Sequence, residues 1–408
     1  MCNLVRLAII LGIFSAASIA LGADFEAHPS LAVSEEYADN VFETPGNRVS
    51  DYITRILPGI VMSYKAPSLT GDLSYVFDYR NYARNTHKNE VAHSLSTKGH
   101  LNVVENLMYL DVSDEYQRVP LDATRDTSSG SLFVNQSDRN QATVSPNLIF
   151  HPTERIMVKA AYRFIDIRYF DPGGIDKVDH VASLDMAYEL TKRLSLTAGY
   201  TFTRELADID NFSQHQVLGG FRYEYADKSF VYAQAGKNRL QYDRGTLLDS
   251  FVWNAGITQV FDTVTGTIST GVKYNDDPRS TVIKEVFVSG TAEKRFINGS
   301  LSLFPYYSEF VQSKSNILQT RKYGAIVRSQ YELTDDINCT VSFTAEKYEQ
   351  PQLGSYTRRF QIIPRLNYIL AKELTASLSY NYDDYYSPGI LVDNRHVNRA
   401  MIEIKKIF

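Results

Sequence analysis

The histidines and the short catalytic motifs are the first places to look for chemistry. His87, His93 and His100 lie close together near one predicted loop, and the other five histidines are dispersed. The three could form a metal site, but scattered loop histidines explain them more simply. No G-x-S-x-G, H-E-x-x-H, C-x-x-C or glycine-rich phosphate loop is present, and such motifs supply the nucleophiles, metal ligands and anion cradles of many enzymes. We therefore expect no catalytic residue, no cofactor and no metal.

Two acidic pairs and one cysteine complete the reactive groups. Asp276-Asp277 and Asp383-Asp384 have the oxygen chemistry of a calcium site or an acid pair, although solvated carboxylates at strand ends are the simpler interpretation. Cys2 and Cys339 are the only cysteines, so a disulfide framework is excluded. Cys339 falls on an apolar row near a short turn, where we interpret it as a small hydrophobic residue.

The most informative charged residues alternate with apolar ones along extended segments. The candidates for lining a polar interior are Arg55, Lys159, Arg163, Arg222, Lys273, Arg328, Arg359, Arg365, Asp72, Asp185, Glu224 and Asp383. Asp78, Glu189, Glu332 and Glu346 share these faces. Rings of charge in a pore select charged solutes, and arginine suits carboxylate, sulfate or phosphate groups. The alternative is that these residues pair with one another and merely solvate the interior, and their mixed signs argue against strong anion selectivity.

Strands with a period of two must position these residues. From Leu194 to Phe202, Leu, Ala, Tyr and Phe alternate with Ser, Thr and Gly, and Ile337–Ala345, Phe360–Leu370 and Leu374–Tyr382 show the same alternation. Soluble strands usually have about 5–6 residues, whereas tilted membrane strands need about 9–11, which is close to the length of these segments. Tyrosines at the ends of the apolar faces are typical of the aromatic girdle of a membrane barrel.

The composition agrees with a barrel and excludes other classes. The 408 residues are 44% hydrophobic with a net charge of −5, which is not the composition of a disordered chain or of a basic nucleic-acid binder. The mean hydropathy is negative, so a bundle of membrane helices is excluded. The 28 Tyr and 21 Phe are explained if aromatic rings meet the two membrane interfaces.

The connections between the segments alternate between short and long. Short ones lie at 192–193, 227–228, 297–299, 334–336 and 371–373, and long polar ones lie between them. We expect an all-β, transmembrane, antiparallel up-and-down barrel with an even number of strands, about 20 within a range of 16–20, and both termini in the periplasm. The first strand is expected at 30–40, and Pro305 and Pro364 are expected to mark bulges. A soluble sandwich or propeller is the alternative, but no repeat of blade length is visible.

The two ends of the chain carry targeting signals. Arg6, an apolar run and small residues before Gly22 have the form of a cleaved signal peptide, so we expect residues 1–22 to be removed and residues 23–408 to form one outer-membrane barrel. The terminal Phe408 on an amphipathic strand resembles the signal that the bacterial barrel-assembly machinery reads. Lys406 departs from that pattern, but a lysine at the periplasmic rim can reach water.

The start of the predicted barrel resembles a known family. Residues 29–41 contain Asp39-Asn40, and residues 50–60 read Ser-Asp-Tyr-Ile-Thr-Arg-Ile-Leu-Pro-Gly-Ile. This looks like the opening of the β-barrel porin family that includes outer-membrane proteins associated with PEP-CTERM/exosortase systems. The tyrosine-rich stretch from Leu73 to Tyr82 fits the same family. The resemblance implies export of exopolysaccharide across the outer membrane, and it carries over no catalytic residue.

Our working hypothesis is therefore an outer-membrane pore that serves as a conduit for exopolysaccharide. The alternatives are a general or solute-selective diffusion porin, an outer-membrane enzyme, and a plugged structural barrel. The expected partners are the outer-membrane lipid bilayer of a Gram-negative-type cell, the barrel-assembly machinery, polysaccharide and periplasmic export components, with no nucleic acid.

Overall fold

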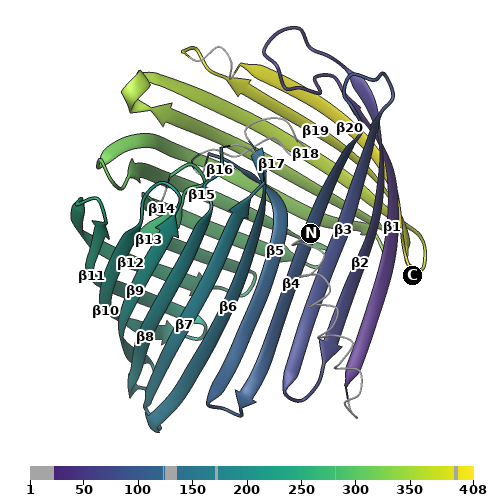
Figure 1. Ribbon diagram of the computed structural model, residues 1–408. Helices are drawn as coiled ribbons and strands as arrows, with labels where there is room; N and C mark the ends of the chain where they lie inside the picture. Colours follow the sequence, from purple (N-terminus) through teal and green to yellow (C-terminus); the bar gives the residue numbers. More distant parts are fainter. Residues whose placement is uncertain (1–22, 123, 125–135, 171–172, 281, 390–393) are drawn as a thin grey trace.

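The computed structural model describes residues 23–122, 124, 136–170, 173–280, 282–389 and 394–408. In these residues the chain forms one antiparallel sheet of 20 strands in which each strand pairs with the next, and β1 pairs with β20 to close a barrel (Figure 1). The strands are β1 Asp24–Ala38, β2 Asp51–Lys65, β3 Leu69–Tyr82, β4 Glu90–Val104, β5 Met108–Pro120, β6 Gln136–Thr153, β7 Ile156–Tyr169, β8 Lys177–Thr191, β9 Leu194–Ala207, β10 Phe212–Ala226, β11 Ser229–Tyr242, β12 Leu247–Val260, β13 Val264–Asp276, β14 Val282–Phe296, β15 Gly299–Gln312, β16 Ile317–Thr334, β17 Ile337–Gln350, β18 Ser355–Ala371, β19 Leu374–Tyr386 and β20 Arg395–Ile407. The short 3-10 helix η1 spans Pro351–Leu353. In the described part of the chain, no helix is long and apolar enough to cross a membrane.

The predicted up-and-down barrel with an even strand number near 20 is confirmed. The five predicted short connections are turns, with only residues 192–193, 227–228, 297–298, 335–336 and 372–373 between the strands. These turns lie at the end of the barrel that carries the chain termini, which we name the periplasmic end, and the longer loops lie at the external end. The first strand begins at Asp24, earlier than expected, because Asp24–Pro29 extends the pairing with β2. The predicted signal peptide, residues 1–22, lies outside the described residues.

The outward rows of the strands are apolar and exposed. In β19, Leu378 is 57% exposed, and in β12, Phe251 is 61% exposed. These side chains lie on the rows opposite to the polar residues of the same strands. An outer surface of this kind is unfavourable in water, at roughly 25 cal/mol per Å² of apolar area, and suits the hydrocarbon of a bilayer.

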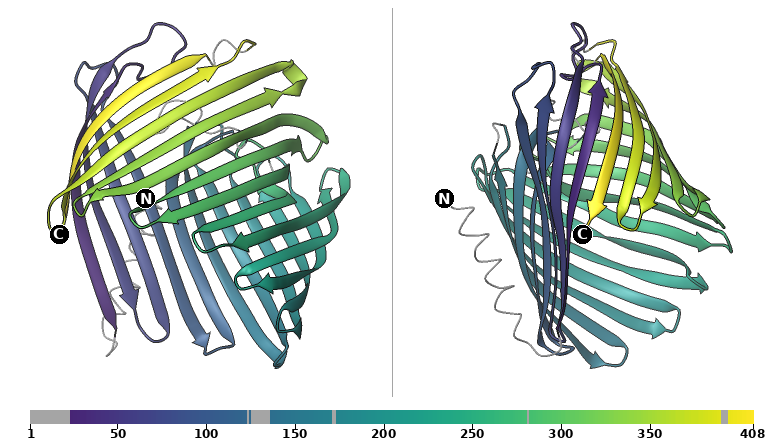
Figure 2. Two further views of the ribbon diagram at one scale, coloured as in Figure 1. Left: turned by 180° about the vertical axis from the view of Figure 1, so that it is seen from behind. Right: turned by 90° about the vertical axis from the view of Figure 1, so that its right-hand side faces the viewer.

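Inward-facing glycines allow the wall to bend sharply. A Cβ on Gly236 would lie 1.7 Å from the Val217 carbonyl oxygen, and one on Gly220 would lie 2.0 Å from that of Ala233. Figure 2 shows the uneven wall that results, with β1–β5 forming a steep side and the strands around β10–β14 strongly inclined to it.

The expectation that Pro305 and Pro364 mark bulges is wrong. Between β14 and β15 the pairing is interrupted around Pro305, but Ser289↔Tyr306 and Ala292↔Leu303 keep one register. Pro364 causes the same kind of gap between β18 and β19 and stays paired with Val341 of β17 on its other side. A proline has no N–H to donate, so it removes hydrogen bonds on one side without inserting a residue. The shifts in register lie elsewhere, mostly beside the periplasmic turns, as at Glu189/Thr191 and Ile369/Ala371.

One pair of neighbouring strands, β12 and β13, has a much shorter paired region than the strand pairs beside it; we name the paired region between two strands a seam. Between β12 and β13, only Asn254–Val260 pairs with Thr265–Gly271. The adjoining seams are longer, since β11 pairs with β12 from Phe230 to Gln241 and β13 pairs with β14 over its whole length. The external halves of β12 and β13 therefore lack ladder hydrogen bonds to each other.

Candidate functional site: the inner wall of the barrel

The inner wall is divided into an external half and a periplasmic half. In the external half, large inward side chains are almost completely buried, among them Tyr82 at 1%, Tyr242 at 2% and Tyr348 at 1% exposure. In the periplasmic half, inward residues such as Arg222 are exposed. The interior is therefore packed near the external loops and accessible to water near the periplasmic turns.

A buried ion-pair network stands in the packed half. Arg359 of β18 donates to Asp383 of β19 through Nε at 3.0 Å and Nη2 at 3.2 Å, and its Nη1 lies 3.3 Å from Glu346 of β17. Tyr348 donates to Glu346 as well. All of these groups are buried, and a charge in such surroundings persists only when it is paired and hydrogen-bonded. The network joins three neighbouring strands at one level.

A second network joins β1, β2, β3 and β20 to the first external loop. Arg55 donates to both carboxylate oxygens of Asp78, at 3.1 and 2.6 Å. Glu43 in the loop after β1 is buried, and it accepts a 2.9 Å hydrogen bond from Arg399 and lies 3.4 Å from Arg395. This loop is thereby held inside the barrel mouth.

Other external residues make contacts across the interior. Thr124, from the loop after β5, is hydrogen-bonded to Thr320 on β16 at 3.3 Å. Lys177 of β8 donates to Asp276 at the end of β13 and to the Asp277 carbonyl oxygen. Lys314, from the loop after β15, lies 2.6 Å from Asp210 in the loop after β9.

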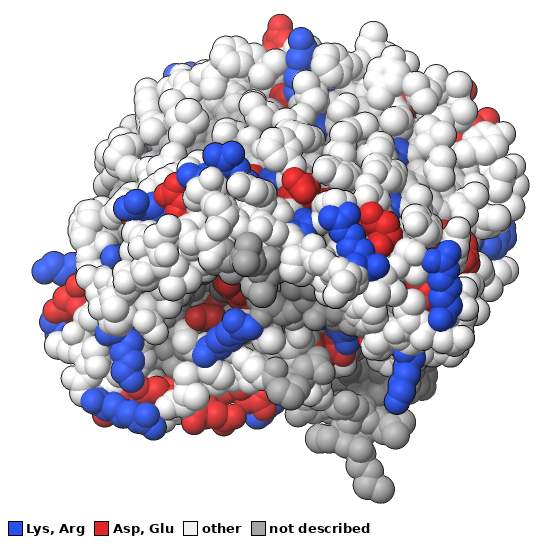
Figure 3. Space-filling view, turned by 90° about the horizontal axis from the view of Figure 1, so that it is seen from above, with Lys and Arg blue, Asp and Glu red and all other residues white. Residues whose placement is uncertain are grey.

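These contacts tie distant parts of the wall together at the external end. Seen from above, basic and acidic side chains lie next to one another across this face rather than in regions of a single sign (Figure 3).

The twelve predicted lining residues all fall on inward rows, but they differ in what they contact. Arg55, Arg359 and Asp383 belong to the buried networks described above. Lys273 lies 3.1 Å from Glu285, and Arg365 lies 3.1 Å from Glu403. The remaining seven have no ion pair within the described residues: Lys159, Arg163, Arg222, Arg328, Asp72, Asp185 and Glu224.

Three of these basic residues without an ion pair lie over aromatic rings, and the Lys159 Nζ is 5.9 Å from the centroid of Tyr109. The Arg222 guanidinium is 3.4 Å from the centroid of Phe230, and that of Arg328 is 5.4 Å from the centroid of Phe304. A cation is attracted to the face of an aromatic ring, so these stacks hold the arginines along the wall while leaving their donors free. Free donors of this kind are available to a solute.

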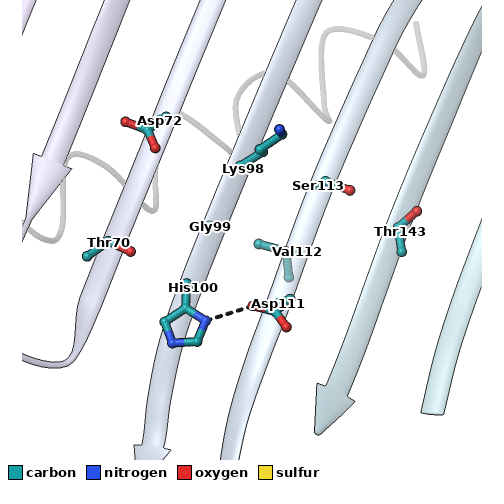
Figure 4. Close-up of a pocket in the computed structure, with 9 residues that line it drawn as sticks. All are labelled: Thr70, Asp72, Lys98, Gly99, His100, Asp111, Val112, Ser113 and Thr143. Carbon is teal, nitrogen blue, oxygen red and sulfur yellow. Dashed lines mark hydrogen bonds and ion pairs between the residues drawn. The ribbon is translucent and has the colours of Figure 1, made fainter. Parts of the chain in front are cut away.

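A cavity of about 360 Å³ opens on the inner wall at β3–β6. Asp72, Lys98 and His100 line it together with the hydroxyls of Ser113 and Thr143 (Figure 4). His100 Nδ1 lies 2.7 Å from Asp111, and Lys98 has no ion pair among the described residues. The sequence analysis missed Lys98 and Asp111 and placed His100 in a loop, although they follow the same period of two.

A second cavity of about 240 Å³ lies on the inner wall of β7–β11. Asp185 faces it together with the amides of Gln216 and Gln234 and the hydroxyls of Thr197 and Thr201. The lining of both cavities is rich in uncharged hydrogen-bonding groups.

The three neighbouring histidines do not converge. His87 lies in the loop after β3, His93 faces outward and contacts the Tyr75 hydroxyl, and His100 faces inward. No group of three or more His, Cys, Asp or Glu side chains in the described ranges could hold a metal ion. Cys339 is a free thiol on the outward row of β17. At the periplasmic rim, Lys406 donates to the Lys372 carbonyl oxygen at 3.1 Å.

Comparison with known proteins identifies the fold and no family. No family model matches the sequence, and no curated protein is similar to it. Among solved structures, the ferric enterobactin receptor PfeA of Pseudomonas aeruginosa in complex with enterobactin is similar, with a TM-score of 0.56 at 9% identity over 95% of this chain and 82% of that one. The FrpB iron transporter of Neisseria meningitidis has a TM-score of 0.55 at 9% identity over 94% and 83%. The siderophore receptor PirA of P. aeruginosa has a TM-score of 0.51 at 10% identity over 94% and 80%.

The chain is an outer-membrane β-barrel. Its closed sheet and exposed apolar outer rows agree with the shape of these receptors. The predicted localisation in a Gram-negative outer membrane is therefore confirmed.

Proposed function

We propose that this barrel is a gated outer-membrane conduit for a hydroxyl-rich solute. The observation that carries the proposal is the division of the inner wall, which is packed and ion-paired at the external end and polar and accessible at the periplasmic end. A solute enters the periplasmic half freely and passes only when the external closure opens. We name the accessible periplasmic half the vestibule and the ion-paired external half the gate.

The lining of the vestibule suits carbohydrate. Sugars present many hydroxyl groups, and the two cavities offer amides, hydroxyls and single charges as hydrogen-bonding partners. Lys98, Lys159 and Arg222 add cationic groups that would bind the carboxylates or phosphates of an acidic polysaccharide. Exopolysaccharide export, implied by the resemblance at residues 29–60, is the specific form of the proposal. It is supported by this lining and by the access from the periplasm.

Two other functions, a diffusion porin and a receptor for iron chelates, would require different features of the barrel. A general diffusion porin needs a passage that is open at rest, which the external packing disfavours. Uptake of an iron chelate is the function that the names of the similar receptors suggest for those proteins; here it would require a binding site reached from outside.

Planar-bilayer conductance tests the gate. We expect the native barrel to conduct rarely and in small steps. Lys177→Met combined with Asp210→Asn removes two contacts across the external end and should give long-lived open states. Arg295→Met is the matched control, because Arg295 pairs with Glu293 in an exposed position near a periplasmic turn. A large steady conductance of the native barrel would favour a porin, and silence of every variant would favour a structural barrel.

Deletion of the gene tests the solute. Secreted polysaccharide should fall in the deletion strain and recover on complementation with the native gene, while uptake of ferric chelates stays unchanged. Unchanged secretion would contradict export, and loss of chelate uptake would support the receptor function instead.

A further inference from the structure

A structural unit that is repeated on the outward face has no part in the proposed conduit. In each copy, a Tyr-x-Phe sequence on one strand faces a histidine on the next. Phe77 pairs with His93, Phe164 with His180, and Phe202 with His215. In every case the tyrosine two residues before the phenylalanine places its hydroxyl on the histidine Nδ1. We name these three copies the Tyr-Phe-His modules.

The geometry of the modules is nearly identical. The distances from the Tyr hydroxyl to the His Nδ1 are 2.8 Å for Tyr75–His93, 2.6 Å for Tyr162–His180 and 2.8 Å for Tyr200–His215. The phenylalanine and histidine rings are in contact, with centroids 5.3, 5.4 and 4.9 Å apart. Such agreement at three separate strand pairs indicates a common requirement rather than chance.

All the modules lie at one level of the barrel. Each histidine is the fourth residue of a strand that follows an external loop, namely β4, β8 or β10. The outward residues on the periplasmic side of the histidines are apolar and exposed, such as Leu184, Leu196 and Val217. On the external side the outward rows of β7 and β9 become charged, with Asp166, Arg168 and Arg204. The modules therefore mark the boundary between hydrocarbon and headgroups in the outer leaflet.

The histidines present a free ring nitrogen, Nε2, at that boundary. In the tautomer in which the tyrosine hydroxyl donates to Nδ1, the ring proton is on Nε2, and Nε2 is then a donor. For the described residues, the Nε2 atoms of His93, His180 and His215 have no hydrogen-bond partner. They lie on exposed outward rows, so their donors point into the headgroup layer.

Cations stand beside two of the modules. Arg204 is directly opposite His180, and Arg239 is opposite His215. Arg204 is paired with Asp243 and Arg239 with Asp249, through two hydrogen bonds each. These carboxylates offset the positive charges of the two arginines. The guanidinium groups nevertheless have further N–H donors on the outward face beside the histidines.

A fourth strand pair provides an internal contrast. Tyr380 donates to Asn398 across β19 and β20 at 2.5 Å, and Asn398 is again the fourth residue of its strand. Here the outward donor is already used, because Asn398 Nδ2 donates to Asp39 at 2.6 Å. The fold thus tolerates an amide at this position, but only the histidine copies leave a donor free.

We infer that the Tyr-Phe-His modules bind the phosphate groups of outer-leaflet lipid headgroups. A phosphate has only acceptor oxygens, which match the Nε2–H and guanidinium donors. The tyrosine holds the imidazole in orientation, and the phenylalanine ring stays in the apolar layer. The strip from β7 to β11, with two modules and two arginines, is the strongest of these sites.

The test measures lipid bound to the full-length barrel. The purified protein is exchanged into micelles that contain either bis-phosphorylated lipid A or the same lipid A after enzymatic dephosphorylation, and retained lipid is counted by native mass spectrometry. The native barrel should retain phosphorylated lipid A preferentially. The triple variant His93→Phe, His180→Phe and His215→Phe should bind it about tenfold more weakly at each site, because each site loses one hydrogen bond to a charged group.

Controls separate binding from folding and from a free-anion site. His28→Phe with His151→Phe changes two exposed histidines near the periplasmic end and should leave retention unchanged. The triple His→Asn variant follows the native Asn398 arrangement and should fold as judged by heat-modifiable gel migration. Among the described residues no aspartate takes up its Nδ2 donors at the three modules, so it should restore part of the retention that the triple His→Phe variant loses. Equal retention by the native barrel and both triple variants, or equal retention of dephosphorylated lipid A, would overturn the inference. Displacement of lipid A by millimolar inorganic phosphate would show a free-phosphate site and would overturn it as well.

Discussion

Arg359 and Asp383 join β18 to β19 through two hydrogen bonds of 3.0 and 3.2 Å inside the packed half of the barrel. The Arg359 side chain is 4% exposed and that of Asp383 is 0% exposed. A third group, Glu346, shares the guanidinium. The pair is therefore one side of a triad, and its two members are not equivalent.

Removal of the Arg359 side chain should lower the free energy of unfolding more than removal of the Asp383 charge. Arg359→Met leaves Asp383 buried without its cation and Glu346 with only Lys322, at 3.7 Å, so we expect about 3–5 kcal/mol of lost stability. Asp383→Asn leaves Arg359 paired with Glu346 and should cost less. Urea unfolding in lipid vesicles measures both, and the reverse order would show that Glu346 does not share the charge.

Lys98 and Lys159 should set part of the ion preference of the open barrel. Both lie on the inner wall of the periplasmic half without an ion pair in the described part of the chain. With Lys177→Met and Asp210→Asn present to open the barrel, Lys98→Gln plus Lys159→Gln should shift the reversal potential in a salt gradient toward cation selectivity. Lys192→Gln, in the turn after β8, is the control that should cause no shift. An unchanged potential in the double glutamine variant would place the ion path elsewhere.

Gly236 and Gly219 should differ sharply in their tolerance of a methyl group. Gly236→Ala would place its Cβ 1.7 Å from the Val217 carbonyl oxygen, whereas in Gly219→Ala the nearest atom is 3.9 Å away. The first variant requires the backbone to move, and overpacking of this kind costs about 1–3 kcal/mol or more. We expect a reduced yield of heat-modifiable, folded barrel for Gly236→Ala only. Equal yields would mean that the bend at β10–β11 relaxes easily.

The Asp243 carboxylate should titrate below its ordinary range. The hydrogen bonds from Arg204 are the largest cause that lowers the pKa of Asp243. Because the folded-state pKa is depressed, the pair stabilises the loop after β11 at any pH above the unfolded value. That contribution is lost only as the pH falls through the lowered folded value.

The carboxyl ¹³C shift of Asp243 measures this titration. Arg204→Gln should bring the midpoint back toward that of an ordinary aspartate. A midpoint that is the same with and without Arg204 would show that the pair does not form in solution.

Much of the fold could be predicted because alternation is a local property. The apolar residues of Leu194–Phe202 and Phe360–Leu370 assign each side chain to one face, and the two-residue turns follow from where the alternation stops. The partner of an inward charge could not be predicted. Arg359 meets Glu346 and Asp383 because of the register of β17, β18 and β19, which the period of two does not determine.

The contacts across the external end were also beyond sequence reasoning. The contacts of Lys177 with Asp276 and of Lys314 with Asp210 join residues about a hundred positions apart. The modules were a different kind of omission. Tyr75-x-Phe77, Tyr162-x-Phe164 and Tyr200-x-Phe202 are visible as a repeated triplet, each followed at the start of the next strand by a histidine, but the histidines were interpreted one by one.

The short seam between β12 and β13 has a mechanical consequence. When a closed sheet is pulled apart, it opens first at the strand pair that has the fewest hydrogen bonds. Between β12 and β13, only residues 254–260 and 265–271 are paired. The external halves of the same two strands are not paired with each other, so separation of the strands would begin there. A barrel pulled apart by its external loops should therefore open first between β12 and β13, giving a single sheet with these two strands as its edges.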